Sequence, residues 1–101
     1  MAKTEVRTKI KPNLKLMEPS MFKVLYLNDD VTTMDFVVGS LVEHFEHTEE
    51  TAMKITEDIH HQGSAVVAIL PYEIAEQKGV EVTMAARRQG YPLQIKIESK
   101  D

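Results

Sequence analysis

The apolar residues of this chain recur with two different periods along its length. Residues 21–27 form a short run of aromatic, β-branched and aliphatic side chains that stops at the polar residues 28–30, which predicts a strand ending in a turn. Residues 93–98 alternate between apolar and polar side chains and predict a half-buried strand. Residues 65–70 form a continuous apolar run of strand length, which predicts a central strand buried on both faces.

Three further segments carry apolar residues at helical spacing. The first follows Thr32 or Thr33, either of which can cap a helix, and its apolar stripe comprises Met34, Val37, Val38, Leu41, Val42 and Phe45. The second runs from the capping residue Thr48 to Gly63, with a stripe of Ala52, Ile55 and Ile59. The third begins after Pro71 and ends at Gly90, with a stripe of Ile74, Ala75, Val82, Ala85 and Ala86.

The order strand, helix, helix, strand, helix, strand predicts an α+β fold. We expect a small open α/β sandwich, in which three helices cover one face of a three-stranded antiparallel sheet. The domain is expected to span residues 20–101. Residues 1–19 have weak periodicity and two prolines, and we expect them to form a flexible N-terminal extension.

Composition agrees with a single small domain. The chain has 101 residues, of which 43% are hydrophobic, enough for a core and too many for a disordered chain. It has no cysteine, which excludes a disulfide framework, a thiolate zinc site and a cysteine nucleophile. Neither a membrane-spanning apolar run of roughly 20 residues nor a secretory signal is present, so we expect a cytoplasmic protein without a membrane partner.

Charge is distributed unevenly. The net charge is −4, but residues 1–19 carry five basic and two acidic side chains, so residues 20–101 carry −7. An acidic domain is a poor partner for nucleic acid, whose binding rests on Lys and Arg that neutralise phosphates. We therefore expect no nucleic-acid partner.

The candidate chemistry lies at the end of the first strand. Asn28 and Asp29 follow an apolar run, and Thr32, Met34 and Val37 come next at helical spacing, while His60 lies at the end of the second helix. This combination would hold a small cation beside an apolar group, as in a free protein N-terminus with a bulky first side chain. The plainer alternative is that Asn28 and Asp29 only close a turn, and that His60 is packed or solvated.

Other chemistries find weaker support. His44 and His47 lie three residues apart on one predicted helix, a spacing that would suit zinc. A small metal-dependent or acid/base enzyme using Asp29, Asp30 and His60 is the alternative function. A structural subunit of a larger assembly is a third class. No serine lies on a strained elbow, and the four glycines are too widely separated for a phosphate loop.

The ordered set of motifs between residues 19 and 98 resembles the ClpS family, the adaptors that carry N-degron substrates to a Clp-type AAA+ unfoldase and its protease. The motifs are Phe22-Lys23-Val24, Leu27-Asn28-Asp29-Asp30, Thr32, Met34-Asp35-Phe36-Val37, Ile59-His60-His61-Gln62-Gly63, Glu73-Ile74-Ala75-Glu76-Gln77-Lys78 and Pro92-Leu93.

The resemblance implies a non-enzymatic adaptor, with no cofactor and no bound metal, acting as a monomer. It implies that Asn28, Asp29 and His60 hold the α-amino group of the substrate. It further implies a specificity pocket for Leu, Phe, Tyr or Trp, lined by Thr32, Met34, Val37, Thr56, Ile59 and Leu93. Glu73 and Lys78 fall where the family contacts the N-terminal domain of a ClpA/ClpC-type unfoldase, and residues 1–19 fall where the family has the segment used in delivery.

The resemblance also carries expectations about selectivity. Met34 stands where the family excludes β-branched first residues. Thr56 replaces a frequent methionine and so bears on pocket depth, while Thr33 replaces a frequent proline and His61 a frequent aromatic residue. Protonation of His60 would remove its acceptor nitrogen, so binding is expected to weaken below about pH 6.

Overall fold

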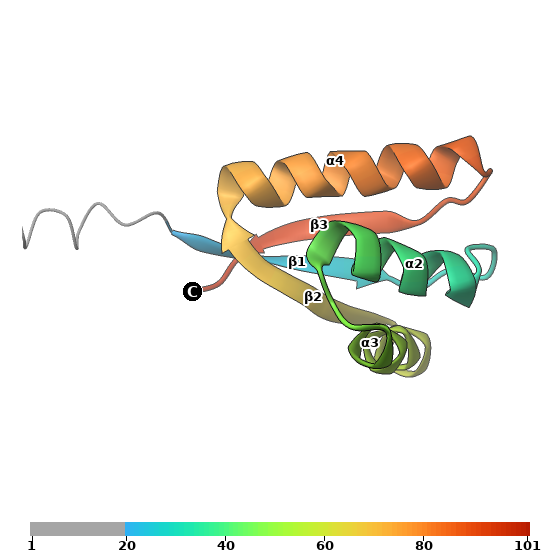
Figure 1. The fold of residues 1–101 in the computed structure, drawn as a ribbon. Coiled ribbons are helices and arrows are strands. Elements are labelled where there is room, and N and C mark those ends of the chain that lie inside the picture. The colour runs from blue at the N-terminus through green and yellow to red at the C-terminus, as the bar shows by residue number, and fades with distance from the viewer. Residues whose placement is uncertain (1–19) are drawn as a thin grey trace, which may run out of the picture.

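The computed structural model describes residues 20–101 as one sheet with helices packed against it (Figure 1). The expected extension over residues 1–19 lies outside the described residues. The elements, in chain order, are β1 (Met21–Leu27), α2 (Met34–Phe45), α3 (Glu49–Gln62), β2 (Ser64–Pro71), α4 (Tyr72–Arg88) and β3 (Gln94–Ser99). This order and the three-stranded antiparallel sheet confirm the predicted fold class.

The strand order is β2-β1-β3, so β1 lies in the centre and pairs antiparallel with both neighbours. The prediction that residues 65–70 form the central strand was wrong, because β2 lies at an edge. Val67 is buried, whereas Val66 and Ile69 remain 39% and 43% exposed on the open face of the sheet. A continuous apolar run therefore did not require two covered faces here.

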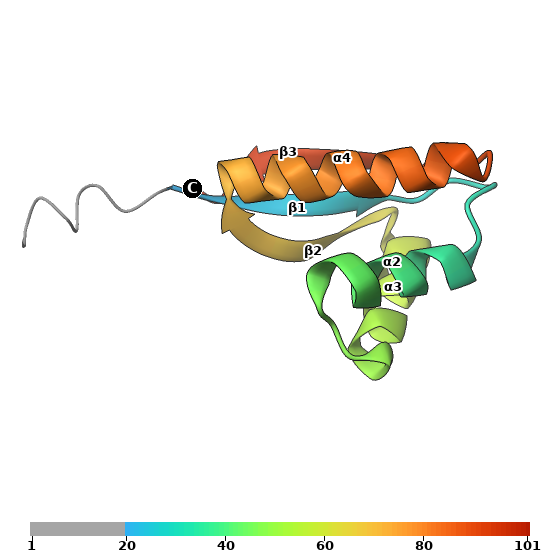
Figure 2. The same cartoon turned by 45° about the horizontal axis from the view of Figure 1, so that its top comes forward.

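The core forms where the helices meet one face of the sheet (Figure 2). Val24 and Tyr26 on β1 are fully buried there, as the alternation of side chains along a strand requires. The buried apolar residues of the helices are Val37, Leu41, Ala52, Ile59, Ala75, Val82 and Ala86. Ile95 and Ile97 on β3 pack against this cluster, as their alternation predicts.

Three members of the predicted helical stripes are exposed. Met34, Val42 and Ile74 are 48%, 40% and 43% exposed. A helical period marks an arc of the surface, and only the part of that arc that faces the sheet or another helix is covered. Met34 and Ile74 also lie in the first turns of their helices.

The helix ends follow local side-chain chemistry. Thr33, not Thr32, caps α2, and its hydroxyl accepts a hydrogen bond from the backbone N–H of Phe36 at 3.2 Å. Thr48 caps α3 in the same way. Gly63 ends α3 with φ of 91°, a left-handed conformation that favours glycine.

One polar pair lies inside the core. The Tyr26 hydroxyl and Ser40 Oγ are 2.8 Å apart, and Ser40 Oγ donates to the carbonyl oxygen of Val37, also at 2.8 Å. A serine has one hydroxyl hydrogen, so Tyr26 is the donor within the pair. Burial raises the pKa of the Tyr26 phenol above its ordinary value.

Replacing Ser40 by alanine is expected to lower the free energy of unfolding by about 1–3 kcal/mol, because the buried Tyr26 hydroxyl would lose its partner. Tyr26→Phe should cost less, about 0.5–1.5 kcal/mol, since Ser40 keeps its bond to Val37. Urea denaturation measures both, with the exposed Ser99→Ala as control. A larger loss for Tyr26→Phe than for Ser40→Ala would contradict this assignment.

Candidate functional site

A cavity of about 390 Å³ opens between the loop that follows β1 and the helices α2 and α3. Figure 1 shows this loop at one end of the sheet, leading into the start of α2. The cavity is lined by Asn28, Asp29, Asp30, Val31, Thr32, Thr33, Met34, Val37, Thr56, Ile59 and His60. Eight of the nine residues predicted for the amino-group site and the pocket are among them.

The polar rim of the cavity comes from the end of β1 and the end of α3, and a single backbone hydrogen bond joins these two segments. The N–H of Asn28 donates to the carbonyl oxygen of Gly63 at 2.8 Å, which ties the end of β1 to the end of α3. His60 lies in the last turn of α3. Asn28 and His60 are thus neighbours across the same cavity despite their distance along the chain.

The side chains of Asn28 and His60 are available to a ligand. Within residues 20–101, neither side chain takes part in a hydrogen bond or an ion pair, and both are exposed. The His60 ring meets the His61 ring edge-on, with centroids 5.3 Å apart. An amide oxygen and a neutral imidazole nitrogen are both acceptors, so this side of the rim suits a donor.

Asp29 organises the loop as well as contributing charge. Its Oδ1 accepts hydrogen bonds from the backbone N–H groups of Val31 and Thr32, and its Oδ2 accepts one from the Thr32 hydroxyl, at 2.7–2.8 Å. Burial raises the pKa of Asp29, but these bonds and the positive charge of Arg87 outweigh it and leave the pKa below its ordinary value. The turn-closing interpretation therefore holds for Asp29, which also presents an ionised carboxylate to the cavity.

The apolar wall is built by α2 and α3. Val37, Thr56 and Ile59 are 6%, 4% and 4% exposed, whereas Met34 is 48% exposed. The Thr56 hydroxyl donates to the carbonyl oxygen of Ala52 at 2.7 Å, so its polar group is bonded within its own helix. A polar residue at this position therefore need not make the wall polar.

Leu93, the ninth predicted residue, does not line this cavity. It is 1% exposed and belongs to the core, where the alternation that carries Ile95 and Ile97 inward also places it. Conversely, the structure adds Val31 and Thr33 to the lining, together with Asp30, which the sequence offered only for the enzyme alternative. Val31 has no signal in the sequence beyond its place in this loop, whereas Thr33 is a helix-cap candidate.

The residues predicted to contact an unfoldase lie elsewhere. Glu73 is exposed in the first turn of α4, beside Phe22 and Tyr72, and Lys78 is half-buried further along the same helix. Figure 1 shows the start of α4 at the end of the sheet opposite to the loop after β1. The two predicted surfaces are therefore separated by the length of the sheet.

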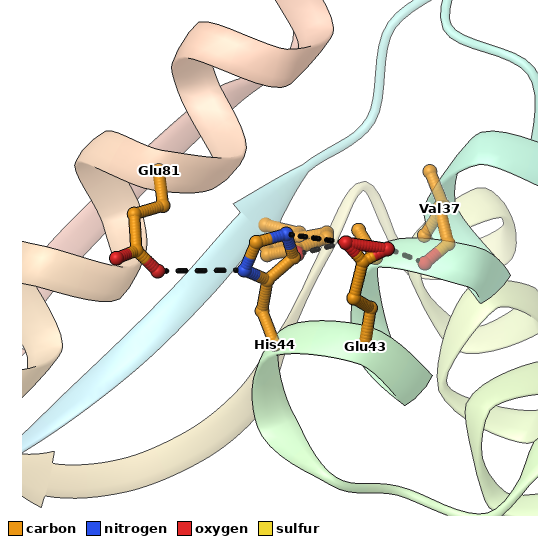
Figure 3. Close-up of polar contacts among 6 residues, drawn as sticks. Val37, Glu43, His44 and Glu81 are labelled. Carbon is orange, nitrogen blue, oxygen red and sulfur yellow. Dashed lines mark hydrogen bonds and ion pairs between the residues drawn. The ribbon is translucent and has the colours of Figure 1, made fainter.

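The residues considered above for a metal site or a metal-dependent enzyme make other contacts. The His44 ring lies between Glu43 and Glu81, at 3.7 and 3.5 Å (Figure 3). His47 Nε2 is 2.7 Å from the carbonyl oxygen of Val67 on the edge strand. Asp29, Asp30 and His60 line one cavity, but residues 20–101 contain no group of three or more His, Cys, Asp or Glu side chains placed to hold a metal ion.

Comparison with known proteins identifies a family to which the chain is similar. The family model described as ATP-dependent Clp protease adaptor protein ClpS matches residues 17–96. The ClpS of Campylobacter jejuni subsp. doylei is 43% identical over 95 residues, covering 94% of this chain and 99% of that protein. ClpS 2 of Bradyrhizobium diazoefficiens is 43% identical over 97 residues, covering 96% of this chain and 86% of that protein.

A solved structure matches the fold as well. The structure of Agrobacterium tumefaciens ClpS2 bound to L-phenylalaninamide has a TM-score of 0.79 and 36% sequence identity, and the match covers 82% of this chain and 100% of that one. The fold is a small open α/β sandwich with a cavity beside the loop that follows β1. The chain belongs to the ClpS family of adaptor proteins of the ATP-dependent Clp protease. No helix within residues 20–101 is both long and apolar enough to cross a membrane.

Asp29→Asn is expected to lower stability at neutral pH and to lose this effect in acid. Because the folded-state pKa of Asp29 is lowered, its carboxylate stabilises the fold above the ordinary value of about 3.9, and this contribution is lost as pH falls through the lowered value. Urea denaturation from neutral pH down through this lowered pKa should show the free energies of unfolding of the variant and the parent converging. The neighbouring Asp30→Asn is the control, and an equal pH dependence of the parent and Asp29→Asn would contradict the prediction.

Proposed function

We propose that this chain binds the free N-terminal residue of substrate proteins and delivers them to a ClpA/ClpC-type unfoldase for degradation by the associated protease. The observation that carries the proposal is one cavity that combines a rim of acceptor groups with an apolar wall. The similarity to a ClpS2 whose structure is bound to L-phenylalaninamide supports it, because that ligand carries a free α-amino group beside an aromatic side chain.

The α-amino group suits the polar rim. Its ordinary pKa of about 7.7–8.0 leaves it mostly protonated at neutral pH, with three N–H donors. Asn28 and His60 offer free acceptor atoms, and Asp29 offers negative charge. A carboxylate has about four acceptor positions, and the loop uses three of those on Asp29, so room remains for a further donor.

The first side chain of the substrate enters the apolar part of the cavity. Val37 and Ile59 supply aliphatic surface, and Thr56 adds little polarity because its hydroxyl is bonded to Ala52. Burying a Leu or Phe side chain is worth about 1.5–3 kcal/mol. We propose a preference for Leu, Phe, Tyr and Trp, with Met34 at the mouth excluding side chains that branch at Cβ.

Delivery uses the other end of the molecule. We propose that Glu73 and Lys78 on α4 contact the N-terminal domain of the unfoldase, and that residues 1–19 form the extension used in delivery before a domain over residues 20–101. Since the loop after β1, which lines the cavity, and the start of α4 lie at opposite ends of the sheet (Figure 1), substrate and unfoldase can be bound at the same time. The adaptor acts as a monomer in the cytoplasm, without cofactor or catalysis.

The enzyme alternative finds less support from the site. Acid/base chemistry by Asp29, Asp30 and His60 would need a carboxylate free to exchange protons with substrate. The Asp29 carboxylate instead accepts three hydrogen bonds from its own loop, and its lowered pKa makes it a weaker base.

Peptides that differ only in their first residue test the proposal. Leu-first and Phe-first peptides should bind, Ala-first peptides should bind weakly, and acetyl-Leu should bind at least about tenfold more weakly than Leu, because acetylation removes the charge and most donors. Fluorescence anisotropy measures this. Asn28→Ala should weaken binding of the Leu peptide, and equal binding of the free and acetylated peptides would refute recognition of the N-terminus.

Met34→Ala should relax discrimination against β-branched first residues. Removing the side chain at the mouth gives room for a branch at Cβ, so the ratio of Leu-first to Ile-first affinity should fall by about fivefold or more. Met84→Ala on α4 is the matched control, since Met84 is 52% exposed and lies outside the cavity. An unchanged ratio in Met34→Ala would rule out this role.

A further inference from the structure

The segment between α4 and β3 is held by one arginine. Arg87 Nη1 donates to the carbonyl oxygens of Tyr91 and Leu93 at 2.7 and 3.0 Å. The chain reverses through Gly90, whose φ is 79°, and the Tyr91 N–H returns to the carbonyl oxygen of Ala86 at 2.9 Å. Charge-assisted bonds of this kind are stronger than neutral ones, so they fix the backbone on both sides of Pro92.

This segment presents Tyr91 to the first turn of α2. The Tyr91 ring meets the Phe36 ring edge-on, with centroids 5.3 Å apart and planes at 68°. Its hydroxyl accepts a long hydrogen bond of 3.4 Å from Thr33 Oγ1, the group that also caps α2. Tyr91 thus contacts α2 both at its cap and at Phe36.

The contact with Phe36 lies on the side of α2 away from the cavity, whereas Thr33 is part of the cavity lining. Phe36 is two residues from Met34, which places it about 200° around the helix from that residue. The cavity lies between α2 on one side and Thr56, Ile59 and His60 of α3 on the other. The distance between these two walls therefore depends on what supports α2 from behind.

We propose that Arg87 and Tyr91 are positioning residues for substrate selection: Arg87 fixes the turn that carries Tyr91, and Tyr91 holds the start of α2, with Met34 and Val37, at its distance from α3. We call the set Arg87, Tyr91, Thr33 and Phe36 the α2 brace. This inference rests on the proposed function, because it gives the brace the task of keeping the cavity selective for the first side chain of a substrate.

The charge of Arg87 also acts on Asp29, in the loop that follows β1. Burial raises the pKa of Asp29, the hydrogen bonds of Thr32 and Val31 lower it, and the guanidinium of Arg87 lowers it further. Arg87 therefore helps keep the Asp29 carboxylate ionised while bracing α2.

The variant Arg87→Gln tests the α2 brace, and Arg88→Gln is its matched control. Arg88 is the adjacent exposed arginine and makes no hydrogen bond or ion pair within residues 20–101, so both variants remove one positive charge from the same helix end. Competition binding of Leu-first and Ile-first peptides should show the Leu/Ile affinity ratio falling by about fivefold or more in Arg87→Gln, with Arg88→Gln unchanged. An unchanged ratio in folded Arg87→Gln overturns the proposal.

Hydrogen exchange of the free protein supplies a readout that needs no peptide. The amides of Val31, Thr32 and Phe36, whose acceptors lie in the loop and the cap, should exchange faster in Arg87→Gln than in Arg88→Gln, while β1 amides stay unchanged. If the parent binds no peptide, the proposed function fails, and this experiment still decides whether the brace holds the loop.

A second pair of variants separates positioning from folding. Tyr91→Leu keeps apolar bulk but removes the ring and the hydroxyl, and should lower the Leu/Ile ratio as Arg87→Gln does. Tyr91→Phe keeps the ring contact with Phe36 and should retain most of the selectivity. If Arg87→Gln does not fold, Tyr91→Leu takes its place as the test of the α2 brace. A Leu/Ile affinity ratio and hydrogen-exchange rates equal to those of the parent in Tyr91→Leu would then overturn the proposal.

Discussion

The cavity depends on the hydrogen bond between the N–H of Asn28 and the carbonyl oxygen of Gly63. Gly63 stands in the left-handed conformation that ends α3, so its carbonyl can meet the end of β1 only because the helix stops there. This contact sets the polar rim, with Asn28 on one side and His60 on the other. It also sets where the following loop departs toward α2, and hence the position of the apolar wall.

The Asp29 carboxylate stabilises its own loop and, in the proposed function, also takes part in recognition. Three hydrogen bonds from its own loop hold it in place and keep it ionised before any ligand arrives. Such preorganisation would lower the entropy cost of the proposed binding, because the loop is already ordered. Asn28 and His60 complement it, since neither side chain is bonded within residues 20–101 and both can meet a donor without breaking an existing contact.

The separation of surfaces also follows from the fold. The central strand β1 runs from the end where α4 begins to the end where the loop after β1 leads into α2 (Figure 1), and that loop lines the cavity. Helices cover one face of this sheet and form a single core there, which leaves the two ends of the sheet free for the two proposed binding surfaces. Helix α4 spans both regions, with Glu73 in its first turn and Arg87 in its last.

The six elements, their order and the caps at Thr48 and Gly63 follow from the sequence alone, because strand alternation, helical spacing and cap chemistry are local, whereas most of the cavity lining came from the family resemblance. The resemblance through local motifs supplied the candidate roles of Asn28, Asp29 and His60. Only the tertiary structure placed β1 rather than β2 in the centre, buried Leu93 in the core and set Arg87 and Tyr91 behind α2. Those outcomes depend on which helix and strand faces pack together across long stretches of chain. A local sequence pattern does not specify which distant segment packs against it.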